Sequence, residues 1–175
     1  SPSSIGILFD RVTAHAAAYL DYRTRTLVNG RLTAGGVVHL DAVTVIDGRN
    51  DARTDGFGVG TDTEANDGGN RTLEIGQTRG ITLVEVQGAG RLTAHTVTVT
   101  ASVDSLRASA NSRAHAGAGY ANVNAKSDLR VGGSAEVALT SGSIIAGAMV
   151  TIAARYLNVD LFSRSDASCS CGGGD

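Results

Sequence analysis

The 175-residue sequence contains few of the large rings on which most globular enzymes rely. It has no Trp and one Pro, and Phe, Tyr and Trp together make up 4% of its residues. Aromatic side chains usually dominate the core of a compact domain, so this core must be built from smaller side chains. Hydrophobic residues reach 42%, but many of them are Ala and Val, and the chain has 23 Gly. This composition favours tight, repetitive stacking.

The chain also lacks an excess of either charge. Its formal net charge is −2 and its isoelectric point is near 6.0. Lys126 is the only lysine and the arginines are scattered singly, so the sequence has no basic patch. Nothing in the charge pattern supports binding to nucleic acid or to an anionic membrane. We therefore expect neither nucleic acid nor membrane insertion.

Long apolar runs are missing as well. No stretch of about 18 apolar residues could form a transmembrane helix. No basic segment followed by an apolar one opens the chain, as it would in a secretory signal peptide. The chain begins SPSS and ends SCSCGGGD. We expect both ends to be cuts through a longer polypeptide.

Cysteine is scarce, with Cys169 and Cys171 forming a single C-x-C. We interpret them as a pair in a loose tail, 166–175. A disulfide bond, including one to another chain, and half of a metal site are the alternatives. Two thiols alone cannot complete a tetrahedral zinc site.

What the sequence has in quantity is period-two alternation of apolar and polar residues. The runs are separated by Gly, Asn, Asp and Ser, a pattern typical of many strands with regular turns. Leu92 and Ala94 are apolar at even positions, 97–103 at odd positions, and 106–110 again at even positions. A one-residue shift moves the apolar set to the other face of a strand. We therefore predict a chain that turns corners while keeping its apolar side inward.

The alternation belongs to an internal repeat. GRLTA occurs at 30–34 and again at 90–94, 60 residues later. TLEIGQTRGITLVEV (72–86) aligns with DLRVGGSAEVALTSG (128–142) at an offset of 56, and the next stretch aligns Leu92 with Ile145 at 53. These offsets define a module of 55 to 60 residues. We predict an all-β fold, a right-handed parallel β-helix or β-solenoid with roughly 20 residues per coil and about three coils per module.

The stretch ASANSRAHAGAGYANVNAKSDLRVGGSAEVALTSGSIIAGAMVTIAAR resembles the repetitive regions of filamentous-haemagglutinin-like proteins and related giant bacterial adhesins. In those regions, runs of alternating Ala and Ser precede a Gly-rich step and strands like LRVGGSAEV and GAMVTIAAR. The resemblance covers about residues 30–165 and is best over 72–155. It implies an extended right-handed β-solenoid, export from the cell, and a structural or adhesive role. It brings no catalytic residues.

The acidic stretch 47–70 is the strongest candidate for a site, and we expect it to protrude as a polar loop. Carboxylates suit a hard cation such as calcium, which is the alternative interpretation. The nonapeptide repeat of calcium-binding β-rolls is absent, and the aligned segment 118–126 has no Asp. The candidate ligands are Asp47, Asp51, Asp55, Asp62, Glu64 and Asp67.

Two further patterns could carry chemistry. Paired carboxylates on adjacent coils could cleave polysaccharides, and Asp41, Asp104 and Asp160 each follow an apolar strand at similar positions in the module. Asp also ends strands because it favours turns. The histidines His15, His39, His95 and His115 are isolated, and we interpret His39 and His95 as structural equivalents in two copies.

Thr96, Thr98 and Thr100 lie on one outward face, as in ice-binding solenoids, but the next copy keeps only Thr151. Asn70-Arg71-Thr72 is a formal glycosylation sequon. Neither pattern is repeated enough to define a site.

Taken together, the residues predict a single segment, 1–175, of a longer repetitive chain or filament, located outside the cell or on its surface. We expect a structural or adhesive rod, stalk or filament module that is not an enzyme and has no cofactor. We assign no catalytic, cofactor-binding or metal-binding residues. The expected partners are other copies or neighbouring repeats, end to end, with surface glycans or other cells as further candidates. A carbohydrate-active β-helix enzyme and a calcium-stabilised binding module are the alternatives.

Overall fold

The computed structural model describes residues 3–5, 9–66 and 72–170 of the chain. All regular structure in these residues is β-strand, which confirms the all-β prediction. Ten strands follow one another along the chain: β1 (Ser3–Ile5), β2 (Phe9–Ala14), β3 (Ala18–Val28), β4 (Arg31–Thr33), β5 (Val37–Ala65), β6 (Leu73–Gln87), β7 (Arg91–Ala125), β8 (Leu129–Val131), β9 (Ser134–Thr140) and β10 (Ser143–Cys169).

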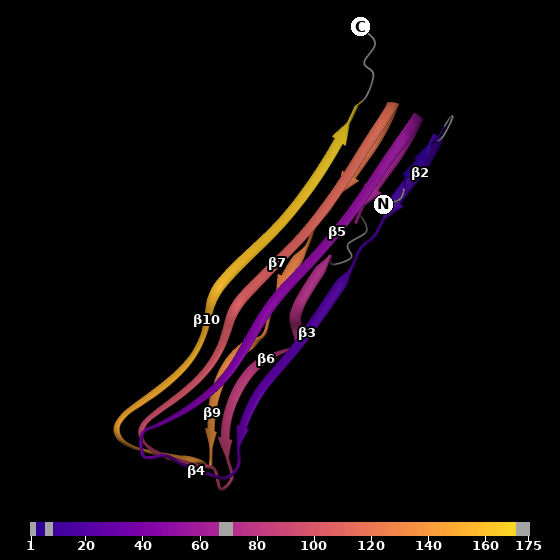
Figure 1. Cartoon of the computed structure of the whole chain (residues 1–175). Coiled ribbons are helices and arrows are strands. Elements are labelled where there is room, and N and C mark those ends of the chain that lie inside the picture. The colour runs from indigo at the N-terminus through magenta and orange to yellow at the C-terminus, as the bar shows by residue number, and fades with distance from the viewer. Residues whose placement is uncertain (1–2, 6–8, 67–71, 171–175) are drawn as a thin grey trace.

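The strands form two sheets in which every named strand pair is parallel. Sheet A has the order β1-β5-β7-β10, with β2 also paired to β5 and β4 to β7. Sheet B has the order β3-β6-β8, with β9 also paired to β6. Figure 1 shows β10 running upward while β3, β6 and β9 run downward, so the two sheets have opposite strand directions.

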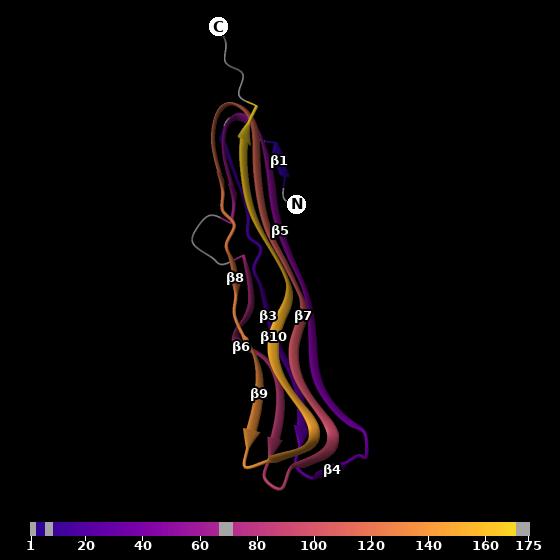
Figure 2. The ribbon, with the colours of Figure 1, turned by 90° about the vertical axis from the view of Figure 1, so that its left-hand side faces the viewer.

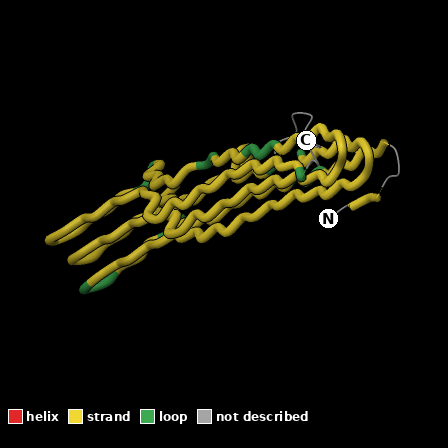
Figure 3. The backbone as a smooth tube through the Cα atoms, turned by 90° about the horizontal axis from the view of Figure 1, so that it is seen from above, coloured by secondary structure: helices red, strands yellow, loops and turns green. Residues whose placement is uncertain are grey.

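One circuit of the chain, called a rung below, rises along sheet A and descends along sheet B. β5 and β7 are so long that each curves over the upper end of the molecule and starts the descent itself (Figures 2 and 3). The first rung is 31–87 and the second is 91–140. Part of a circuit, 3–28, precedes them, and β10 follows them. The stack is therefore thin along its axis and long within each rung.

The size of a rung corrects one prediction. Paired strands join residues 51 to 60 positions apart, from Phe9 with Gly60 to Arg31 with Arg91. The repeat of 55 to 60 residues is thus one circuit, and the prediction of roughly 20 residues per coil is wrong. The physical reason is that Gly and Asp inside β5 and β7 do not turn the chain back. Ladder hydrogen bonds on neighbouring strands hold those residues extended.

The repeat alignment itself is confirmed in most places. Leu73 pairs with Leu129, and Val97 pairs with Val150, as aligned from the sequence. Two details differ. Leu92 pairs with Ile144 rather than Ile145, and the aligned strand 81–86 is shifted by three residues. Both differences lie beside short turns, where the number of residues varies from rung to rung.

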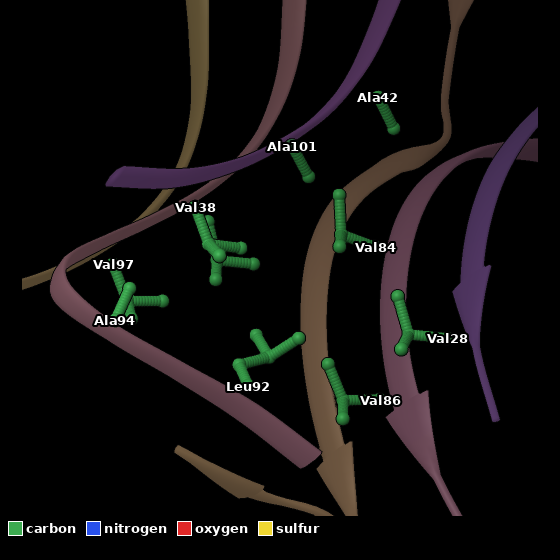
Figure 4. Packing of buried hydrophobic residues seen from close by; sticks show 10 residues of the cluster. Val28, Val38, Ala42, Val84, Val86, Leu92, Ala94, Val97 and Ala101 are labelled. Carbon is green, nitrogen blue, oxygen red and sulfur yellow. The ribbon is translucent and has the colours of Figure 1, made fainter. Parts of the chain in front are cut away.

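The core lies between the sheets. Leu92, Val97 and Leu106 of β7 are fully buried, which confirms the predicted inward face on both sides of each phase shift. In Figure 4, Leu92 points toward Val84 and Val86 from the opposite sheet. The second phase shift coincides with a bulge, since Thr44 and Val45 of β5 pair with residues 103 and 105 of β7 and leave Asp104 unmatched. A bulge of this kind re-aims the residues that follow it.

Candidate functional site

The acidic stretch does not form the expected protruding loop. Residues 47–65 continue β5, and Asp67 lies outside the described residues. Asp47, Asp51 and Asp55 point outward from sheet A at intervals of four residues, about 13 Å at 3.3 Å per residue. Carboxylates so far apart cannot share one calcium ion, because ligand distances to calcium are about 2.3–2.6 Å.

Each of these carboxylates has a protein partner instead. Asp47 accepts from Arg49 Nε at 3.3 Å, and Asp55 accepts from Arg53 Nε at 3.0 Å. Asp51 accepts from Asn111 Nδ2, one strand away, at 2.7 Å. No group of three His, Cys, Asp or Glu that could hold a metal ion occurs among the described residues.

The carboxylates considered for glycan cleavage are also separated. Asp41 pairs in register with Thr100 and Asp160 with Arg107, seven positions apart along β7, which is about 23 Å. Asp104 sits at the bulge and accepts from Ser102 Oγ at 2.6 Å. Glycosidase carboxyl groups lie about 5–9.5 Å apart, so Asp41 and Asp160 cannot act as such a pair.

The histidines are not equivalent as expected. His39 pairs in register with Thr98, three residues from His95, so these histidines do not occupy one column. His39 Nε2 lies 2.8 Å from Asp41 Oδ1. The His115 ring packs edge-on against Phe57, with 6.2 Å between centroids. These contacts join His39 to a residue of its own strand and His115 to a residue of the neighbouring strand.

Two smaller sequence patterns end at the described boundary. Cys169 closes β10 and is disulfide-bonded, while Cys171 lies outside the described residues. Residues 166–169 belong to β10 rather than to a loose tail. Of the sequon, only Thr72 is described, and its Oγ1 accepts from the Asp128 amide at 2.7 Å. The row of threonines at 96, 98 and 100 is not repeated on the neighbouring strand β10, because Thr96 and Thr100 pair with Met149 and Ala153.

A tyrosine crosses the stack beside a column of glycines. The side chain of Tyr22 extends from β3 toward the neighbouring rungs. A Cβ atom at Gly133 would overlap the Tyr22 hydroxyl, so glycine leaves the space that this hydroxyl occupies. Gly76 leaves room beside the ring in the same way, with 2.9 Å between a built Cβ and Tyr22 Cε1. The Tyr22 hydroxyl reaches that of Tyr156 on β10, 3.4 Å away. Burial, and then the bond to Tyr156, raises the pKa of the Tyr22 phenol well above its usual range.

A hollow lined by aromatic side chains, which no sequence pattern indicated, lies beside β2. Phe9, Gly60 and Tyr120 form one register column, and the two rings are 85% and 77% exposed. They line a hollow of about 460 Å³ together with residues of the adjacent column, Arg11, Asp62 and Asn122. Gly60 and Tyr120 could be aligned from the repeat. Phe9 could not, because its offset of 51 lies outside the repeat that the alignments cover.

In the described part of the chain, an exposed apolar surface lies along the outer edge of β10. Val150, Ile152, Val159 and Leu161 occupy the register positions of buried β7 residues, yet they are 47%, 48%, 53% and 48% exposed. No described strand pairs with β10 on the side away from β7. This surface can accept another strand through its backbone and further apolar side chains through its inward face.

Comparison of the chain with protein-family models, with curated proteins and with solved structures finds no match. In the described part of the chain, there is also no helix with the length and hydropathy to cross a bilayer.

Proposed function

We propose that this chain is a structural module, a segment of a right-handed parallel β-helix that forms a rod, stalk or filament outside the cell or on its surface. The observation that carries the proposal is the stacking of like on like. Val38, Val97 and Val150 share one column, as do Ala42, Ala101 and Ala154. A rung that offers the same residues above and below can be repeated without changing its design.

The outward face supports a mechanical role. Several of its charges are paired, as in Arg53–Asp55 and Arg164–Asp166. Asp41 and Asp160, two of the carboxylates considered for glycan cleavage, are too far apart on this face to act as a catalytic pair. The chemistry of the module therefore lies in its stacking, and we infer that it is not an enzyme.

Duplication of one rung tests the proposal. A variant carries a second copy of 91–142 inserted after Gly142, so that β7 is followed by another β7. If rungs are interchangeable, this variant folds, unfolds cooperatively at higher denaturant concentration, and is thicker by about one strand spacing, 4.8 Å, in small-angle scattering.

The control variant duplicates only 91–116, which stops before the chain has returned along sheet B. We expect this half-rung to lower stability, because its inward residues have no opposite strand. A full-rung variant that is no more stable than the half-rung variant would contradict the stacked-module proposal.

A second candidate function, the binding of a carbohydrate ring, is favoured by the Phe9–Gly60–Tyr120 hollow. Two strand spacings separate the aromatic residues, about 9.6 Å, with only glycine between them. A sugar ring needs apolar contact on its C–H faces and polar partners at its edges. Asp62, held by Asn122 Nδ2 at 3.1 Å, supplies a fixed carboxylate beside the rings.

Saturation-transfer NMR with cellotetraose and chitotetraose tests this binding. We expect signal from at least one oligosaccharide, and its loss in Phe9→Ala and in Tyr120→Ala. Tyr19→Ala removes an aromatic ring that is 70% exposed on β3 and should leave the signal unchanged. Absence of signal from both sugars, or equal signal in all variants, would rule this candidate function out.

A further inference from the structure

We propose that a second copy of this chain stacks head to tail on β10, with the register that joins successive rungs inside one copy. The inference rests on the proposed stacked-module function and names its partner and polarity. In this arrangement, β4 and the first part of β5 (37–54) of the second copy lie along β10. Its β3 lies along β9 and faces β10 across the core.

Two free edges make this possible. Among the described strands, β10 pairs only with β7, and 37–54 of β5 also pairs only with β7, because β1 and β2 cover residues 55–57 and 60–65 alone. Each edge therefore presents unpaired backbone N–H and C=O groups to solvent. Such an edge accepts another parallel strand when the side chains match.

The two ends of the stack also have complementary shapes, because at each end one sheet extends beyond the other. At one end sheet A extends beyond sheet B, because no described strand of the same rung lies opposite β10. At the other end, β3 is the outermost described strand of sheet B, and in that part of the chain it pairs only with β6. Placing β3 of a second copy opposite β10 would cover Ile152 and Val159, which are now about half exposed. On that β3, the inward-facing Leu20 is 39% exposed, whereas Ile75, its register partner on β6, is fully buried.

Register brings like residues together in the proposed contact. Val38, Leu40 and Ile46 of the second copy would stack on Val150, Ile152 and Val159, as they already stack on β7. On the outward face, Arg164 would meet Asp51 and Asp166 would meet Arg53, both pairs of opposite charge. Asp160 would meet Asp47, and this repulsion is the unfavourable contact of the series.

The strand ends fit this register closely. Ser3, Asp55, His115 and Ser168 lie in one column, so β10 reaches the column in which β1 of the second copy begins. Of the described residues, Ser168, Cys169 and Ser170 would overlap β1 and must move aside. The contacting surfaces differ from each other, so the association does not close, and repeated stacking gives a filament.

Two edge-blocked variants of the full chain test the inference. Ile152→Lys places a charge on the inward face of β10, and Leu32→Lys places one on β4, where Leu32 is 40% exposed. Both sites are half exposed in a single copy but would be buried in the stack, where an unpaired charge is strongly unfavourable. Leu157→Lys is the matched control: Leu157 is as exposed as Ile152, at 48%, but lines the outward hollow of sheet A.

Sedimentation velocity and negative-stain microscopy over a concentration series give the readout. We expect linear assemblies from the native chain and from Leu157→Lys, and association weakened about 100-fold or more in each edge-blocked variant. An equimolar mixture of Ile152→Lys and Leu32→Lys should form dimers and nothing larger, because one free edge of each kind remains. Circular dichroism checks that every variant is folded. Leu20→Lys and Val159→Lys replace any variant that is not.

Three results would overturn the inference: a native chain that stays monomeric, dimers in either blocked variant alone, and no dimers in the mixture. Dimers in one variant alone would mean that an edge pairs with itself. The rung-duplication variant keeps the two proposals apart, since its folding needs no second copy. If the rung-duplication variant is stable but the native chain does not associate, only the head-to-tail contact is refuted.

Discussion

The strands β7 and β10 carry apolar side chains in many of the same inward columns but have very different surroundings. Val97 and Leu106 on β7 are fully buried, whereas their register partners Val150 and Val159 on β10 are 47% and 53% exposed. β7 has neighbours on both sides and strands of sheet B opposite it. Among the described strands, β10 has one neighbour, and its inward face is incompletely covered. In a stacked fold, then, burial is a property of a strand's position and not of its own sequence.

The difference in burial between the two strands has an energetic consequence. Full burial of a Val, Leu or Ile side chain contributes about 1.5–3 kcal/mol relative to exposure, so a half-exposed residue realises only part of this. A terminal rung is therefore held mainly by the rung beneath it, and a middle rung by both of its neighbours. The following substitutions test this comparison, from the largest expected effect to the smallest.

Truncation of the same column in the two strands should give unequal losses. We expect Leu106→Ala to lower the free energy of unfolding by about 2–5 kcal/mol, because it leaves a cavity in a fully buried site. Val159→Ala, in the same column, removes a side chain that water reaches in a single copy, and should lower it by less than about 1 kcal/mol. Urea denaturation followed by circular dichroism measures both values, at protein concentrations below those at which the chain associates. Equal losses would mean that Val159 is buried even in a single copy.

Alkaline pH should act on the tyrosine that links the two ends of the stack. Folding raises the pKa of the Tyr22 phenol above its ordinary value near 10, so the folded chain keeps a proton that the unfolded chain releases. The associated stability is complete below pH about 10 and is lost as the pH rises further.

Unfolding at several pH values between 8 and 11 measures this loss, and Tyr22→Phe should reduce it. Tyr19→Phe, an exposed tyrosine on the same strand, should retain the full pH dependence. A native-like dependence in Tyr22→Phe would show that other groups cause the alkaline loss.

Substitution of outward-facing residues should change stability by similar amounts on the middle strand β7 and on the edge strand β10. Arg113 on β7 and Arg164 on β10 both lie near Asp166, at 3.8 and 3.4 Å, and their side chains are 54% and 58% exposed. Exposed ion pairs contribute about 0–1 kcal/mol, so Arg113→Ala and Arg164→Ala should give similar, small changes in unfolding free energy. A much larger loss at β7 would mean that position in the stack also governs the outward face.

Much of the fold followed from local patterns. The alternation over 92–110 predicted which residues point inward, including both phase shifts, and burial of Leu92, Val97 and Leu106 confirmed it. The repeat predicted which segments lie side by side. These predictions succeed because side chains alternate across any strand and because repeated sequences bury repeated surfaces.

The candidate site could be predicted less well from the sequence. The acidic residues of 47–65 had the composition of a loop, but hydrogen bonds to β7 keep them in β5, where their carboxylates are spread along the strand. Phe9 and Tyr120 lie more than a hundred residues apart, and pairing through Gly60 alone brings them to one hollow. No periodic signal could have indicated that contact.

By itself, the sequence determined the inward face of each strand and the offsets at which segments stack, because both depend on spacing along the chain. The tertiary structure decided that one repeat makes a single circuit, because alternation reports which way a side chain points and not where the chain turns back. It also decided which of two similar strands is buried. β7 and β10 differ little in sequence character, and only the strands beside and opposite them separate a core position from a free edge.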